Sequence, residues 1–314
     1  MENIKLTIAV AIYNIENYLS KCLESLLNQT EKNGYEILLI NDGSTDNSRE
    51  ICEKYIRKGL KAKIIDKENG GLTSVRNLSI DLAKGERILF LDGDDYIEKE
   101  TIEIIFKEME DYDLLVFGFN WISENEIYKD ERFVKNKIYD NKEKIDNLIF
   151  RKEINPAVWN KIFKLDILRN NKLYFMDFKT SEDTPFILLY LKYCTNIKIL
   201  KKYLYNYLYR ENSLANNKNK DFYKNHLNFY LWVLNEEKIK TKFLNNYILE
   251  EYVYLLREIA KKKKYILIEQ KELQGICNEI ENKLKIIKII FDKNISFKFK
   301  LRYLKIRIKK LCQS

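Results

Sequence analysis

The sequence predicts an α/β fold in which helices flank a central, mainly parallel sheet, with a helical extension at the C-terminal end. Over the first part of the chain, short apolar runs typical of buried strands alternate with segments of helical periodicity. Such alternation is typical of a parallel sheet covered on both faces. From about Asp221 onward only the helical pattern remains. We therefore expect one domain over residues 1–215 and a helical region over residues 216–314.

The first two strand–helix pairs follow from their periodicity. Leu6 to Tyr13 is an apolar run rich in branched residues, as expected of a buried strand. Apolar residues at helical spacing follow from Tyr18 to Leu27. A second buried strand, Glu36 to Ile40, stops at the turn Asn41-Asp42-Gly43-Ser44, and Ser48 to Lys58 then has a helical pattern.

The next elements repeat this arrangement. Ala62 to Asp66 predicts a third strand, followed by the turn Asn69-Gly70-Gly71 and a helix from Leu72 to Ala83. A fourth strand, Ile88 to Leu91, ends in the acidic cluster Asp92-Gly93-Asp94-Asp95. The remaining expected core elements are strands at Leu114 to Phe119 and Tyr203 to Tyr209, the segment Trp159 to Phe163, and a helix from Thr184 to Tyr193.

Composition limits the class of protein. A chain of 314 residues with 46% hydrophobic residues can bury one large core or two ordinary ones. The five cysteines are scattered without CxxC spacing, so we expect neither a zinc site nor a disulfide framework. No apolar run has the length of a transmembrane helix, and Met1 to Asn14 has a strand pattern, not that of a signal peptide. We expect a reduced, cytoplasmic protein.

The net charge of +9 arises mainly late in the chain. A basic surface suits nucleic acid, anionic lipid or a phosphorylated substrate. The basic stretch lacks a known nucleic-acid-binding motif. Acidic residues dominate the crevice predicted below at the ends of the strands, so we expect no nucleic-acid partner.

Polar motifs follow three of the predicted strands at the point where each strand ends. They are Tyr13-Asn14, Asp42-Gly43-Ser44 and Asp92-Gly93-Asp94-Asp95. In parallel sheets the ligand lies beyond the carboxyl ends of the strands. The three motifs should therefore meet in one crevice.

The acidic cluster has two possible roles. Asp92 and Asp94 lie one residue apart in a turn, and like charges held close together are costly unless a cation neutralises them. Carboxylate oxygens suit Mg²⁺ or Mn²⁺, which typically bind one or two carboxylates plus substrate phosphates. Such an ion stabilises the charge on a departing nucleoside diphosphate. The alternative is a solvated acidic turn, with Asp95 favouring the N-terminus of the next helix.

Three further residues each have a functional and a structural interpretation. Asp42 can accept hydrogen bonds from a nucleobase or ribose, or form an ordinary Asx turn. Arg76, after two glycines near a helix start, can reach a pyrophosphate or lie on the surface. Asp183 can be a general base for an acceptor hydroxyl or a helix cap. His226, the only histidine, is expected to be structural, which leaves no Ser/His/Asp arrangement.

Together these motifs resemble the family-2 glycosyltransferases of the GT-A fold over about residues 4 to 215. The segments that carry the resemblance are Val10 to Asn14, Asn41 to Asp46, Asn69 to Asn77, Asp92 to Asp95, Trp159 to Phe163, and Ser181 to Asp183. Relatives usually have proline at the position of Ala11 and glycine at that of Ser181, and neither departure removes a charged group.

The resemblance implies roles for individual residues. Ala11, Tyr13 and Asp42 would line the nucleobase pocket, with Asp42 contacting uracil, and Arg76 would lie beside the nucleotide. Asp92 would meet the ribose and, with Asp94, hold Mn²⁺ or Mg²⁺, while Asp183 would be the catalytic base. Weaker matches near the acceptor or the diphosphate are Trp159, Lys161, Glu182, Arg210 and Ser213.

The implied reaction is the inverting transfer of a hexose or N-acetylhexosamine from a UDP-sugar. The acceptor would be a saccharide or a lipid-linked glycan in surface-glycan synthesis, such as capsule or lipopolysaccharide. The alternative is a catalytically inactive nucleotide-sugar-binding module, against which the intact Asp92, Asp94 and Asp183 speak.

The end of the chain has a pattern of its own. Phe297, Leu301, Leu304, Ile308 and Leu311 share one helical face that lysines and arginines surround. This is typical of a basic helix lying in a membrane interface, and it predicts peripheral binding at the inner face of the cell membrane. The alternative is a helix that packs its apolar face on the preceding domain.

Overall fold

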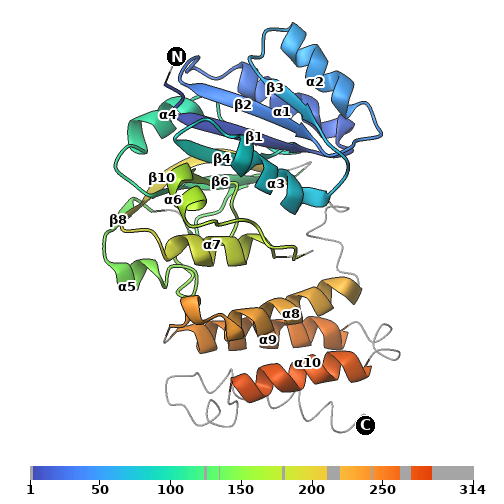
Figure 1. Ribbon diagram of the computed structural model, residues 1–314, viewed down its shortest axis with the longest axis vertical. Helices are drawn as coiled ribbons and strands as arrows, with labels where there is room; N and C mark the ends of the chain where they lie inside the picture. Colours follow the sequence, from blue (N-terminus) through green and yellow to red (C-terminus); the bar gives the residue numbers. More distant parts are fainter. Residues whose placement is uncertain are drawn as a thin grey trace. The chain divides into compact units, whose positions relative to one another are not determined.

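The computed structural model describes residues 3–123, 126–133, 135–178, 181–210, 220–241, 243–261 and 270–284. The chain forms two compact units, Met1–Asp177 with Glu182–Ser213, and Phe178–Ser181 with Leu214–Ser314 (Figure 1). We call them the α/β unit and the helical unit. The domain boundary that the sequence predicts at residue 215 stays a prediction, because residues 211–219 lie outside the described ranges.

In the described residues the α/β unit contains one sheet, ordered β3-β2-β1-β4-β9-β6-β10-β5. Its first half is parallel throughout, because β1 pairs with β2 and β4, and β2 pairs with β3. These strands are β1 (Leu6–Ile12), β2 (Tyr35–Asn41), β3 (Lys63–Asp66) and β4 (Arg87–Asp92). All four lie within two residues of their predicted positions, which confirms the α/β fold and the parallel arrangement predicted for this half of the sheet.

The second half of the sheet mixes strand directions. β9 (Lys161–Lys164) runs antiparallel between β4 and β6 (Leu114–Ile122). β10 (Ile197–Leu208) is parallel to β6 and antiparallel to the short β5 (Tyr96–Ile97). Two short strands that the sequence pattern did not indicate, β7 (Ile127–Lys129) and β8 (Lys137–Tyr139), pair antiparallel with β6 and β10, respectively.

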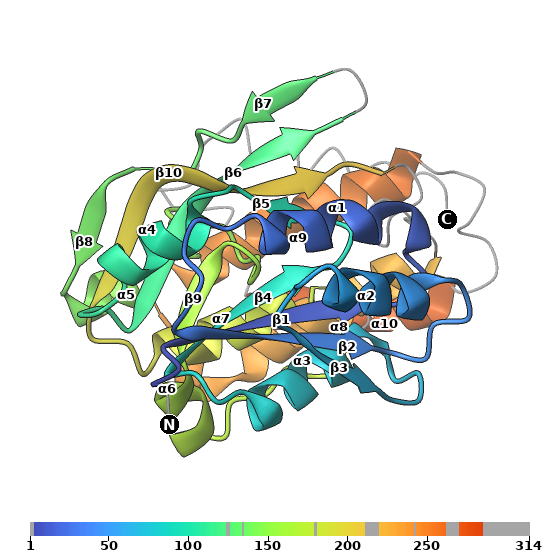
Figure 2. The same cartoon turned by 90° about the horizontal axis from the view of Figure 1, so that it is seen from above.

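Helices cover both faces of the sheet (Figure 2). Apolar side chains of α1 (Glu16–Leu27), α2 (Ser48–Arg57) and α4 (Thr101–Glu108) share a core with alternate residues of β1. On the other face, Val75 of α3 (Gly71–Leu82) packs on Leu38 and Ile40 of β2. Phe186 of α7 (Asp183–Leu191) contacts Phe90 of β4 there. The strands are apolar on both faces for this reason. The unit also contains α5 (Lys142–Ile145) and α6 (Leu165–Asn170).

The helical unit consists, in its described residues, of α8 (Lys220–Asn235), a 3-10 turn (Glu237–Ile239), α9 (Leu244–Lys261) and α10 (Gln270–Lys283). This confirms the helical C-terminal extension. α8 contacts both α9 and α10, and buried apolar side chains such as Leu227, Val233 and Ile248 form the core. Within the described ranges, none of the helices has the length and apolar character needed to span a bilayer. The basic segment from Phe297 to Leu311 lies outside the described residues.

Candidate active site

The carboxyl ends of β1, β2 and β4 lie level with one another. Ala11 pairs with both Ile40 and Asp92, so the strands end in the same register. Gly93 N–H donates to the Ala11 carbonyl at 3.0 Å, and Asp42 N–H donates to the Ile12 carbonyl at 2.9 Å. The three polar motifs therefore meet at one edge of the sheet, as the sequence predicts.

Close backbone packing explains the glycine of the acidic cluster. A Cβ atom on Gly93 would lie 2.6 Å from the Ala11 carbonyl oxygen and 2.6 Å from a methyl carbon of Ile15. Only glycine lets the turn that carries Asp92 and Asp94 lie this close to β1. The motif is thus set by packing as well as by its carboxylates.

The centre of the site is a buried arginine surrounded by carboxylates. Arg76, 3% exposed, projects from α3 and donates to Asp183 Oδ1 at 2.6 Å, Glu182 Oε1 at 3.1 Å and Asp92 Oδ1 at 3.1 Å. Glu182 and Asp183 stand at the start of α7, more than 100 residues from Arg76 along the chain. The structure therefore brings together Arg76, Asp92 and the Glu182-Asp183 pair, which the sequence had singled out separately.

The electrostatics of this cluster favour a base near neutral pH. The pKa of Asp183 is raised to about 7: burial is the largest cause, the Arg76 charge opposes it, and Glu182 and Asp92 add to the rise. For Arg76, burial opposes the charged form, but the three carboxylates outweigh burial and raise its pKa. The side chain of Asp183 is still 18% exposed, so a ligand can reach it. A carboxylate with these properties suits a general base.

Asp94 has a different partner. Its carboxylate pairs with Arg210, which follows β10 and also lies over the ring of Tyr18. Among the described residues, no group of three or more His, Cys, Asp or Glu side chains could hold a metal ion alone. Asp92 and Asp94 still fit Mg²⁺ or Mn²⁺ as a partial ligand set, because such ions commonly complete their coordination with substrate phosphates and water.

Asp95 does not cap a helix, the role that the alternative interpretation of the acidic cluster gave it. Its side chain turns inward, is 2% exposed, and accepts hydrogen bonds from Tyr205 Oη at 2.7 Å and Leu208 N–H at 2.7 Å. Burial, and next Asp92, raise the pKa of Asp95 well above its usual range. The interpretation as a cap is wrong because α4 begins only at Thr101, while Asp95 anchors the acidic turn to β10. Tyr205, which no sequence motif indicated, is its partner.

Asp42 holds the glycine turn. It is 2% exposed, and its carboxylate accepts hydrogen bonds from the amides of Gly70 at 2.9 Å and Gly71 at 2.8 Å. The Lys67 ammonium also binds it. Gly71 has a φ of +81°, which favours glycine, and it starts α3, the helix that carries Arg76. Lys67, the cation that binds Asp42, was not indicated by the sequence, although it lies two residues before the turn Asn69-Gly70-Gly71.

The other predicted residues are placed as follows. Tyr13 is 49% exposed beyond the end of β1, and Ala11 is half-buried. Trp159 and Lys161 are buried, so neither presents a free side chain to a ligand. Ser213 lies outside the described residues.

The backbone conformation at Ser181 shows why relatives usually have glycine at this position. Its φ of +64° lies in the left-handed region that favours glycine, the residue usual in relatives. Ser181 Oγ lies 2.9 Å from Nε2 of His226 within the helical unit. His226 thus has a structural contact, as expected.

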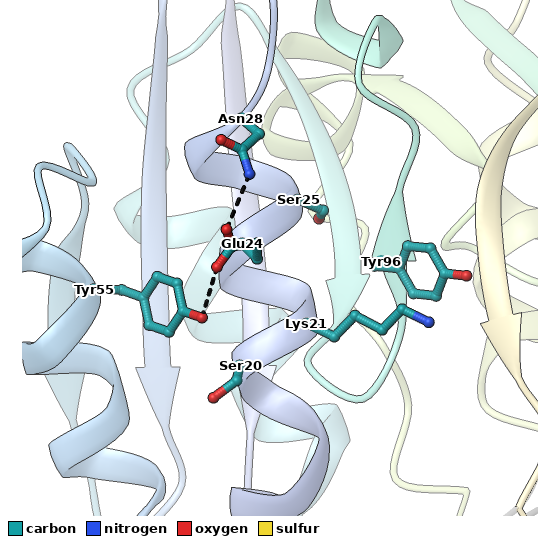
Figure 3. A pocket seen from close by; sticks show the side chains of 7 residues that line it. All are labelled: Ser20, Lys21, Glu24, Ser25, Asn28, Tyr55 and Tyr96. Carbon is teal, nitrogen blue, oxygen red and sulfur yellow. Dashed lines mark hydrogen bonds between the residues drawn. The ribbon is translucent and has the colours of Figure 1, made fainter.

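A shallow hollow of about 400 Å³ lies on the outer face of α1, away from the predicted site residues. Ser20, Lys21, Ser25 and Tyr96 line it, together with Glu24, Asn28 and Tyr55. Glu24 accepts hydrogen bonds from Tyr55 Oη at 2.9 Å and Asn28 Nδ2 at 3.2 Å (Figure 3). None of the carboxylates of the acidic cluster belongs to it, so we do not place the active site there.

The fold and the polar motifs at the carboxyl edge of the sheet are those of an α/β protein of the GT-A type. The profile of the family described as "Glycosyl transferase family 2" matches residues 7–171. The chain belongs to this family, as its motifs predict.

Individual relatives agree with this assignment. The chain is 34% identical over 223 residues to Glycosyltransferase GlyA of Streptococcus pneumoniae, a match that spans 67% of this chain and 31% of GlyA. It is 33% identical over 212 residues to the uncharacterized glycosyltransferase EpsJ of Bacillus subtilis, spanning 66% of this chain and 61% of EpsJ. Each match therefore covers less than two thirds of the relative's length.

A solved structure shows the same fold. Residues 1–349 of TarS from S. aureus, in complex with UDP-GlcNAc, superpose with a TM-score of 0.67 at 24% identity. The superposition covers 89% of this chain and 80% of that chain. This likeness supports the GT-A fold.

Proposed function

We propose that the chain is a glycosyltransferase that moves a hexose or N-acetylhexosamine from a UDP-sugar to an acceptor hydroxyl with inversion. The observation that carries the proposal is the buried Arg76, which joins a carboxylate at the donor end, Asp92, to a carboxylate suited to act as base, Asp183. Membership of glycosyl transferase family 2 and the UDP-GlcNAc bound to TarS support a nucleotide-sugar donor.

At the donor end, the nucleotide would lie at the carboxyl edge of β1, β2 and β4. Tyr13 and Ala11 would line the nucleobase pocket, and Asp42 would contact uracil directly or through the turn it holds. Ser74 Oγ and Arg76 Nε are buried and have no hydrogen-bond partner in the described part of the chain. Such groups are costly unless a ligand satisfies them, which favours a polar donor beside the start of α3.

At the acceptor end, Asp183 would take the proton from the attacking hydroxyl. The acceptor oxygen forms a bond to the anomeric carbon, the bond from that carbon to the diphosphate oxygen breaks, and the electron pair leaves with UDP. One displacement from the opposite face inverts the anomeric configuration. A positioned base of this kind contributes roughly 10²–10⁴-fold to the rate.

A divalent cation is part of the proposal. Mn²⁺ or Mg²⁺ held by Asp94, with Asp92, would neutralise charge that develops on the departing diphosphate. The mannosyltransferase PcManGT from Pyrobaculum calidifontis, whose solved complex contains GDP-Man and Mn²⁺, supports a metal in this fold. Arg210, paired with Asp94, would place a further positive charge near the diphosphate.

The acceptor is proposed from the relatives and from the basic end of the chain. Poly(ribitol-phosphate) beta-N-acetylglucosaminyltransferase TarS, 29% identical over 208 residues, supports an acceptor that belongs to a surface polysaccharide. A basic amphipathic segment from Phe297 to Leu311 would hold the protein at anionic membrane, where a lipid-linked acceptor lies. Sedimentation with anionic liposomes tests this: a chain truncated before Ile295 should bind less than the full chain, and equal binding would contradict it.

The activity is tested by screening UDP-hexoses and UDP-N-acetylhexosamines for UDP release with Mn²⁺ or Mg²⁺. We expect turnover of at least one donor, and its loss in both Asp94→Ala and Asp183→Ala. Full activity in both variants would show that the site is assigned wrongly. UDP binding without turnover of any donor would favour an inactive nucleotide-sugar-binding module.

A further inference from the structure

The irregular segment from Asn155 to Asn160 is anchored by several contacts beside Asp183, the proposed base. Asn160 Nδ2 donates to the Phe117 carbonyl at 2.7 Å, and Phe117 N–H donates back to the Asn160 carbonyl at 3.1 Å. The ring of Trp159 stacks on that of Tyr205, with centroids 4.5 Å apart. Val158, which directly precedes these anchors, donates its N–H to Asp183 Oδ2 at 3.2 Å.

Lys161 lies beneath this segment with its charge enclosed. The side chain is 0% exposed, and its ammonium donates to Ala157 O at 2.6 Å, Asn155 Oδ1 at 2.8 Å and Asn160 Oδ1 at 2.8 Å. An ammonium has three N–H donors, so all of them are used. Burial lowers the pKa of Lys161 to about 7, while Asp183 acts in the opposite direction. Burying a cation costs free energy, so we expect Lys161 to have a role that offsets this cost.

This role depends on a single peptide group. The Ala157 carbonyl, which accepts from Lys161, and the Val158 N–H, which donates to Asp183, belong to the same peptide bond. A charged donor on the carbonyl polarises the peptide and strengthens its N–H as a donor, because successive hydrogen bonds reinforce one another. The cation and the carboxylate are thus linked through one amide.

We propose that Lys161 is a positioning residue: through the Ala157–Val158 peptide it fixes and polarises the amide that holds Asp183 Oδ2. The inference rests on the proposed role of Asp183 as the base. Arg76 holds Oδ1, so the two contacts together set the orientation of the carboxylate. The charged groups that bear on Asp183 are Arg76 of α3, Asp92 of β4, the adjacent Glu182 and Lys161 of β9. This role replaces the direct contact with diphosphate or acceptor expected from the motif.

The test replaces Lys161 with methionine and observes the Val158 amide by NMR. In Lys161→Met we expect the Val158 amide proton to move upfield and to exchange with solvent up to about tenfold faster, as the loss of one hydrogen bond allows. Lys164→Met is the matched control, because Lys164 lies on the same strand with a 43% exposed side chain. An unchanged Val158 amide in folded Lys161→Met would overturn the proposal.

A kinetic readout separates positioning from a general loss of structure. With a donor that the protein turns over, Lys161→Met should lower kcat while UDP affinity stays unchanged. The acid limb of the variant's pH–kcat profile should move to higher pH by about one unit. The reason is that the ionised Asp183 carboxylate loses the stabilising effect of the Lys161 charge and of the polarised Val158 amide. Unchanged kcat and pH profile in the folded variant would contradict the proposal.

A second measurement tests the proposal even if Lys161→Met does not fold. The ¹⁵N titration of the Lys161 ammonium in Asp183→Asn should shift to lower pH than in the unmodified protein, and an unchanged titration would overturn the inference. Both NMR readings need neither donor nor acceptor. They therefore fail or succeed independently of whether Asp183 is the base, which the turnover of Asp183→Asn decides.

Discussion

The two units bury different kinds of side chain. In the α/β unit, Asp42, Arg76, Asp95 and Lys161 are buried, and each makes hydrogen bonds with identified partners. In the described part of the helical unit, the buried side chains are apolar or aromatic, and no charged one is among them. Burying charge is costly unless partners compensate it. The buried charges, and with them the proposed site, thus lie in the α/β unit, while the described helices are built around an apolar core.

Removing the central charge should have the largest effect on stability. Arg76→Met leaves three carboxylates without their shared partner, and breaking a buried pair in this way costs about 3–5 kcal/mol. Urea unfolding measures this loss. Arg49→Met is the matched control: its ion pairs with Glu53 and Asp66 are exposed, and their loss should cost less than about 1 kcal/mol. Equal losses in the two variants would remove the contrast between buried and exposed charge.

The pH dependence of stability tests the same cluster. The pKa of Asp183 is raised to about 7 in the folded state, so folding favours its protonated form. That contribution is fully present below the unfolded pKa near 4 and is lost as pH rises through about 7. Relative to Asp183→Asn, the unmodified protein should lose on the order of 2–4 kcal/mol of unfolding free energy over this range. Parallel stability curves for the two proteins from pH 4 to 8 would contradict the assignment.

Glycine substitutions should have opposite signs in the two units. Gly93→Ala places a Cβ atom 2.6 Å from the Ala11 carbonyl, so we expect a loss of about 1–3 kcal/mol and weaker UDP binding. Gly275 of α10 has no atom within 4 Å of its would-be Cβ. Gly275→Ala should therefore stabilise by about 0.8–1 kcal/mol, as helix propensity predicts. Thermal unfolding of both variants provides the measurement, and a stable Gly93→Ala would show that the acidic turn can move away from β1.

Much of the first half of the fold could be predicted because it is local. The strands β1 to β4 each appear in the sequence as an apolar run. Parallel strands place their carboxyl ends at a common edge, so the meeting of the three polar motifs at this edge could be predicted. The antiparallel direction of β9 could not be predicted from the sequence, because it depends on how the irregular stretch after residue 122 returns to the sheet.

Side-chain partners distant in sequence were also beyond prediction. The inward turn of Asp95 depends on Tyr205, 110 residues away, and the ion pair of Arg76 with Asp183 joins residues 107 apart. Periodicity and local motifs contain no information on such contacts. The sequence therefore indicated which polar residues gather at the carboxyl edge of the sheet but not which ion pairs and hydrogen bonds they form there.

The most direct test of the account is the turnover of a UDP-sugar donor by Asp183→Asn, with UDP affinity measured on the same protein. The account predicts a loss of turnover of roughly 10²–10⁴-fold, because the base is removed, with UDP affinity unchanged, because the donor end of the crevice is intact. Full turnover in this variant, with the fold retained, would contradict the claim that Asp183 is the catalytic base.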